Sequence, residues 1–116
     1  MLVTIYHAAP DFKFANGRSS FSYWGVDSEK EQIKQELHLE ALGKYPEVAT
    51  IEVDTTDVQK ALGLAYQFSN HIESDWSENE GVTLYVDSVR SSSVGDVFEL
   101  NDEVYIIAGF GFDKLQ

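Results

Sequence analysis

The sequence predicts an α+β fold in which two helices pack on a mostly antiparallel sheet with a C-terminal β-hairpin. Two observations support this fold class. Apolar residues recur at helical spacing in the first two thirds of the chain, whereas the last third alternates apolar and polar residues with a period of two. Strands followed by two helices and then a run of strands indicate α+β rather than a repeating parallel unit.

The N-terminal half contains the first predicted elements. Residues 2–7 are rich in β-formers and predict a strand, and residues 21–24, which follow an Asn-Gly turn signal, predict a second one. Ser28 and Glu31 have the spacing of a capping box, so we expect a helix over about residues 29–43. Its apolar positions lie four apart, at Ile33, Leu37 and Ala41.

The second predicted helix is the clearest one. Residues 48–53 predict a strand, and residues 54–56 supply candidate N-caps for the helix that follows. The apolar stripe of this helix extends over five turns and consists of Val58, Ala61, Leu62, Ala65, Phe68, Ser69, Ile72 and Trp76.

Three further strands are predicted in the last third, over residues 82–86, 97–100 and 104–108. Asn101-Asp102 lies between the last two and indicates a two-residue hairpin turn. Residues 109–112 alternate glycine and phenylalanine. They lack the further glycine and the Lys-Ser/Thr pair of a phosphate-binding loop, so we interpret them as packing at a strand end.

Size and composition predict a single domain spanning residues 1–116. The chain has 43% hydrophobic residues and no cysteine, which is compatible with a folded core in a reducing compartment. It shows neither the pattern of a signal peptide nor an 18-residue apolar span, so we expect a cytoplasmic protein without membrane association.

The charge is strongly negative and unevenly distributed. The chain carries 20 acidic and 8 basic residues, a formal net charge of −12, and residues 45–113 hold fourteen acids but only Lys60 and Arg90 as bases. Such a surface repels a phosphate backbone, so direct nucleic-acid binding is not expected. The predicted partner-binding surface is the acidic and aromatic group of Glu73, Asp75, Trp76, Glu78 and Glu80.

The sequence predicts no catalytic, metal-binding or cofactor-binding residues. His7, His38 and His71 are the only histidines, and no two of them have the spacing that directs both toward one metal ion. Ser91, Ser92 and Ser93 match no nucleophile motif. His71 lies near Glu73 and Asp75, which keeps a small-substrate enzyme open as one alternative; the other interpretation is a surface imidazole.

A turn is predicted at Ser93-Val94-Gly95-Asp96. Gly95 suits a positive φ, while the Asp96 carboxylate can accept nearby backbone N–H groups and Ser93 can cap the same bend. With the following strand over residues 97–100, Val104-Tyr105-Ile106-Ile107 and the closing Gly109-Phe110-Gly111-Phe112, this segment resembles the YodL-like domain family. The resemblance extends over residues 44–115 and includes Tyr45, Val48, Tyr66, Phe68, Asn70 and Trp76.

The resemblance implies a small domain of phage or mobile-element proteins without an established catalytic role. Together with the acidity, it predicts a non-enzymatic accessory protein that binds a host or phage protein, in the host cytoplasm if phage-encoded, with a basic surface on the partner. The alternatives are a nucleic-acid mimic that inhibits a restriction or CRISPR nuclease, and the small-substrate enzyme that uses His71. The edge strand of the predicted C-terminal hairpin leaves self-association open.

Overall fold

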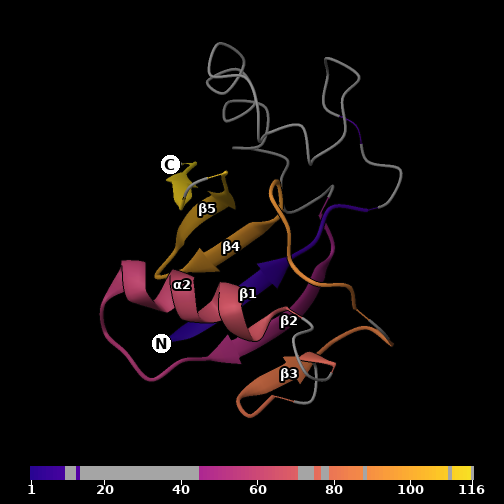
Figure 1. Ribbon diagram of the computed structural model, residues 1–116, viewed down its shortest axis with the longest axis horizontal. Helices are drawn as coiled ribbons and strands as arrows, with labels where there is room; N and C mark the ends of the chain where they lie inside the picture. Colours follow the sequence, from indigo (N-terminus) through magenta and orange to yellow (C-terminus); the bar gives the residue numbers. More distant parts are fainter. Residues whose placement is uncertain are drawn as a thin grey trace.

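The computed structural model describes residues 1–9, 13, 45–70, 75–76, 79–87, 89–109 and 111–115. These residues form a six-stranded antiparallel sheet with one helix across one of its faces (Figure 1). The elements in chain order are β1 (Leu2–Tyr6), β2 (Glu47–Glu52), α2 (Val58–Phe68), β3 (Val82–Leu84), β4 (Val97–Leu100), β5 (Glu103–Ile107) and β6 (Phe112–Lys114).

The predicted fold class, with two helices packed on the sheet, is wrong. The described residues are mostly β, with six strands and the single helix α2. The predicted helix over residues 29–43 and the predicted strand over residues 21–24 lie outside the described residues. The strands predicted over residues 82–86, 97–100 and 104–108 are present as β3, β4 and β5, although β3 ends at Leu84 and β5 covers Glu103–Ile107. β4 and β5 bury residues on both faces, so their sequences are nearly continuous apolar runs.

Helix α2 is shorter than its apolar stripe predicts. Asp57 caps its start, since the Asp57 carboxylate accepts the Lys60 backbone N–H at 2.9 Å. At the other end the Ser69 N–H bonds to the carbonyls of Ala65 and Tyr66, and the helix ends at Phe68. Trp76, the last residue of the predicted stripe, therefore lies beyond the helix, and Ile72 lies outside the described residues.

The sheet has the strand order β3-β2-β1-β4-β5-β6. Strand β1 is central because it pairs with both β2 and β4. The hairpin between β4 and β5 is confirmed: Asn101 and Asp102 have φ values of 51° and 61°, the left-handed conformation that a type I′ turn requires. The interpretation of residues 109–112 as packing at a strand end agrees with Phe112, which packs against the main core, although Phe110 lies outside the described residues. Gly111 (φ 70°) precedes a further short strand, β6, which pairs with β5.

Two apolar clusters fill the two sides of the sheet. The larger one joins alternate residues of the strands to Ala61, Leu62 and Ala65 of α2, and also contains Trp76. The smaller one contains Tyr45 and Leu115 and lies against the other face of β4 and β5, to which Val97 and Ile106 contribute. This second cluster does not extend to β2 and β3. The sheet end around these two strands is therefore the part whose second face has no apolar cover among the described residues.

Candidate functional site

A buried polar cluster surrounds Asp96, directly before β4. Asp96 is 1% exposed, and its two carboxylate oxygens accept two hydrogen bonds each. The Arg90 guanidinium donates to Oδ2 at 2.6 Å and to Oδ1 at 2.8 Å, the Ser93 N–H donates to Oδ2 at 2.8 Å, and the Ala8 N–H donates to Oδ1 at 3.0 Å. The carboxylate therefore ties the chain after β1 to the loop before β4, with its buried charge compensated.

His7 belongs to the same cluster. Its Nε2 lies 2.8 Å from the Ser92 hydroxyl and 3.9 Å from Asp96 Oδ2, and its ring meets Trp76 edge to face at a centroid distance of 6.2 Å. Burial lowers the pKa of His7 to about 4, against the opposing effect of Asp96 and with an additional lowering by the Arg90 charge. His7 is therefore a neutral imidazole near pH 7.

The geometry of this cluster is that of a structural network. In a Ser-His-Asp triad the serine and the aspartate contact different ring nitrogens of the histidine. Here Ser92 and Asp96 both face Nε2 of His7, so the histidine cannot pass a proton between them. All three side chains are buried, and neither of the two pockets described below is lined by any of them.

Sequence reasoning found part of this cluster. The positive φ of Gly95 (90°) and the capture of a local N–H by Asp96 are confirmed, with the difference that the Asp96 side chain caps Ser93 rather than the reverse. The sequence did not lead us to expect Arg90 and His7 in this cluster. The available signal was that Arg90 is one of only two bases in residues 45–113, close in sequence to an aspartate in a glycine turn.

The predicted partner-binding residues have different positions in the structure. Asp75 and Glu80 are exposed, whereas Glu73 and Glu78 lie outside the described residues, as does His71. Trp76 is a correction: it is fully buried, and its indole Nε1 donates to the Arg90 carbonyl at 2.7 Å. A buried indole needs such an acceptor, so Trp76 contributes to the core and not to a binding surface.

Strand β3 forms one edge of the sheet, at the opposite end from β5 and β6 (Figure 1). On its inner side the Gly81 carbonyl accepts the Glu52 N–H at 3.0 Å, and the Tyr85 N–H donates to the Val48 carbonyl at 2.9 Å. Every second residue of an antiparallel strand directs its backbone groups to the partner strand, so those of Leu84 point away from β2. Among the described residues no strand pairs with this outer side.

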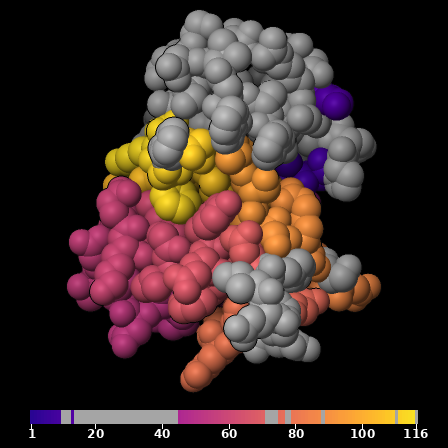
Figure 2. Space-filling view, in the orientation of Figure 1, coloured from indigo at the N-terminus to yellow at the C-terminus, as the bar shows by residue number. Residues whose placement is uncertain are grey.

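Exposed acidic residues lie at both ends of β3. Glu80 and Glu52 lie at its start, where Glu52 bonds to Gly81, and Asp87 and Glu47 lie at its end. All four are exposed. The segment around β3 forms the lower end of the molecule in Figure 2. We call this region, β3 with Glu47, Glu52, Glu80 and Asp87, the acidic edge.

One face of the sheet near the acidic edge carries exposed apolar side chains. Tyr85 is 54% exposed and its hydroxyl lies 3.4 Å from the Thr50 hydroxyl, while Leu2 on β1 is 55% exposed. Thr83 is also exposed. Tyr85 and Leu2 give an apolar contact area beside the charges, and tyrosine is a residue type that is enriched at protein interfaces.

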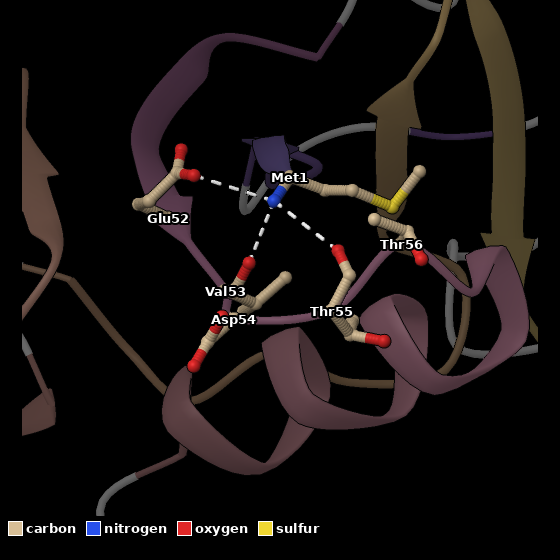
Figure 3. Close-up of a pocket in the computed structure, with 6 residues that line it drawn as sticks. All are labelled: Met1, Glu52, Val53, Asp54, Thr55 and Thr56. Carbon is tan, nitrogen blue, oxygen red and sulfur yellow. Dashed lines mark hydrogen bonds and ion pairs between the residues drawn. The ribbon is translucent and has the colours of Figure 1, made fainter.

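A pocket lies next to Glu52, between the end of β2 and the start of α2 (Figure 3). The amino group of Met1 lies in it, 2.6 Å from the Val53 carbonyl, 3.4 Å from the Thr55 carbonyl and 3.3 Å from Glu52 Oε1. Its lining is completed by Asp54 and Thr56. The three dashed lines in Figure 3 all start at the Met1 amino group, so the one cationic group of this lining is already bound within the protein.

A second pocket, of about 340 Å³, lies between α2 and the turn that joins β5 to β6. Gly63, Tyr66 and Phe112 line it, and the two rings meet edge to face at 6.3 Å. A Cβ at Gly63 would contact nothing within 4 Å, so this mid-helix glycine is not required by packing against the described residues. Tyr66 carries the one titratable side chain among the described residues that line this pocket.

The described residues contain no group of three or more His, Cys, Asp or Glu side chains arranged to hold a metal ion. In the part of the chain that the structure describes, no helix combines the length and the apolarity needed to cross a membrane.

No family model, curated protein or solved structure matches the chain. The resemblance to the YodL-like domain therefore stays a prediction.

Proposed function

We propose that the protein acts without catalysis, as an acidic module that binds another protein through the acidic edge. The observation that supports this most is the contrast between two sets of polar groups. The cluster around Asp96 is buried and satisfied by its own donors, whereas Glu47, Glu52, Glu80 and Asp87 are exposed around an unpaired strand.

The charge indicates a partner with a basic surface. Within residues 45–87 the only basic side chain is Lys60, on α2, so the negative potential of this region is nearly uncompensated. Complementary charges speed association and exclude acidic partners, while Tyr85 and Leu2 add apolar contact area. Following the YodL-like resemblance, the partner is a host or phage protein, and the site of action is the cytoplasm.

Capture from a bacterial lysate tests this proposal. The wild type is compared with the double variant Glu80→Gln, Asp87→Asn, and with Asp102→Asn as a control that removes a charge at the β4–β5 turn. We expect a specific partner whose affinity falls about fivefold in the double variant at low salt, because rim charges contribute up to about 1 kcal/mol each. Equal affinity of the double variant and the control would contradict the proposal.

The same capture separates the alternative functions. A partner that is a DNA-handling enzyme and is released by added duplex DNA would favour the nucleic-acid mimic. Partner binding that persists at high salt would indicate a purely apolar interface, because salt screens exposed charges and leaves apolar contacts intact. The enzyme hypothesis depends on His71, which lies outside the described residues, and it stays a prediction.

A further inference from the structure

We propose that the acidic edge binds its partner by strand addition: an extended, lysine- or arginine-rich segment pairs with the outer side of β3. This inference rests on the proposed function and specifies its partner class and binding mode. The first support is the backbone. The N–H and C=O of Leu84 point away from β2, which is where an added strand forms its ladder.

The second support is the side-chain pattern of β3. Val82 and Leu84 are half-buried and pack against the main core, which holds the strand in register, while Thr83 and the neighbouring Tyr85 are exposed on the other face. An added strand would place its alternate residues beside Thr83 and Tyr85, where cross-strand contacts with an aromatic ring contribute about 0.2–1 kcal/mol each.

The third support is charge complementarity. Glu80 and Asp87 flank β3 and are seven positions apart, at most about 23 Å, so a segment of about eight residues is long enough to reach both ends of the acidic edge. Basic residues at its two ends would meet Glu80 at one end and Asp87 at the other, while Glu47 and Glu52 on β2 add to the negative potential behind β3. These acidic residues are exposed, so they can change partners without a desolvation cost comparable to that of buried groups.

A second copy of the chain fits the same edge less well. Pairing two β3 strands antiparallel would bring Glu80 of one copy toward Asp87 of the other, and each copy has a net charge of −12. Like charges opposite each other in a sheet destabilise the pair. Charged residues at an exposed edge are a usual means of preventing such self-pairing. The complementary occupant is therefore a basic strand from a different protein.

The test uses the full chain and a capped eight-residue peptide that alternates lysine and valine. Two control peptides accompany it: one with glutamate in place of lysine, and one with the lysines retained but every second backbone nitrogen methylated, so that it keeps its charge and cannot complete a ladder. Binding is followed by amide hydrogen exchange and by titration calorimetry at 20 and 200 mM salt.

We expect the Leu84 amide to exchange about tenfold more slowly when the lysine peptide is present at ten times its Kd. The methylated peptide should bind about tenfold more weakly, since each lost ladder bond removes about 1 kcal/mol. Equal binding by the methylated peptide, or an unchanged Leu84 exchange rate at saturation, would overturn strand addition. A Leu84 amide already protected in the absence of peptide, together with a dimer in sedimentation, would overturn it in favour of self-pairing.

A pair of variants gives an independent readout. Leu84→Pro removes the outward N–H, which proline tolerates on an edge strand, and Leu84→Ala removes the same side-chain packing but keeps the N–H. We expect Leu84→Pro to bind the lysine peptide about tenfold more weakly than Leu84→Ala. If Leu84→Pro fails to fold, the methylated peptide still decides the question.

The outcomes also separate this inference from the proposed function. If the lysine and methylated peptides bind equally and both lose affinity in the Glu80→Gln, Asp87→Asn variant, the acidic edge binds basic partners without strand addition. If neither peptide binds at 20 mM salt, both the inference and the proposed function are wrong.

Discussion

The Asp96 carboxylate links segments that are far apart in the sequence. It accepts N–H groups from Ala8 after β1 and from Ser93 before β4, and it pairs with Arg90, whose guanidinium also donates to the Ala8 carbonyl at 3.2 Å. The hydrogen bonds with Asp96 raise the pKa of Arg90 further above its ordinary value. A carboxylate with four donors stabilises the chain conformation on both sides of it, because leaving any of these buried groups unpaired would cost free energy.

Replacing this carboxylate tests its role. Asp96→Asn keeps the shape but removes the charge and places an NH₂ group against the donors of Arg90 or the backbone. We expect the free energy of unfolding to fall by about 2 kcal/mol, less than for a fully buried ion pair because Arg90 is half-exposed. Urea denaturation measures this. Asp102→Asn, in the exposed turn, is the control, and an equally small effect of both variants would contradict the network.

His7 makes stability depend on pH. Its pKa is about 4 in the folded protein and 6.5 in an unfolded chain, so the unfolded state binds a proton first as the pH falls. The resulting stabilisation is complete above pH 6.5 and is lost between pH 6.5 and 4. Between pH 7 and 5, the wild type should lose about 2 kcal/mol more than His7→Gln. Unfolding curves at both pH values check this, and equal losses in the two proteins would refute the assignment.

At the scale of elements, sequence patterns predicted what local residues determine. The Asn101-Asp102 turn was predictable because a turn with positive φ depends on a few adjacent residues. The predicted N-cap of α2 was wrong: the cap is Asp57 and not one of residues 54–56, because several neighbouring Asp and Thr residues are equally good caps. The strands of the last third were predictable because their short runs of apolar, β-branched and aromatic residues are bounded by turn residues, although β4 and β5 are buried on both faces.

Elements that depend on distant contacts were not predictable. The apolar stripe after Phe68 includes Trp76, which is buried and donates its indole N–H to the backbone carbonyl of Arg90. Periodicity alone cannot distinguish such a residue, buried by contacts distant in the sequence, from one more turn of the helix. Strand β6 has only three residues, Phe112–Lys114, and exists because it pairs with β5. The acidic edge was only partly predicted: Glu80 was included, but that β3 is an edge follows from the strand order alone.

Helix α2 contains a site where stability can be gained. Gly63 lies in its interior, and an added Cβ meets no atom within 4 Å. Because alanine favours a helix over glycine by about 1 kcal/mol, Gly63→Ala should raise the free energy of unfolding by that amount. Thermal unfolding measures the shift, which we expect at about 4 °C or more. A lower melting temperature would show that the space above Gly63 is needed by the fold.

At the scale of the molecule, the charge and the sheet order act together. The core of the sheet centres on β1, while the acidic residues around β3 lie at one end, where the second face of the sheet lacks an apolar cover among the described residues. A protein with a net charge of −12 repels copies of itself, which favours solubility and disfavours pairing between two β3 edges. The same charge attracts basic partners over distances of about 10 Å at moderate salt.

The salt dependence of partner affinity tests the account most directly. The Kd of the captured partner is measured between 20 and 200 mM salt for the wild type and for the Glu80→Gln, Asp87→Asn variant. We expect the wild-type affinity to fall steeply with salt and the variant to show a clearly smaller slope, because two of the screened charges are gone. Identical slopes for the two proteins would show that the acidic edge is not the binding surface.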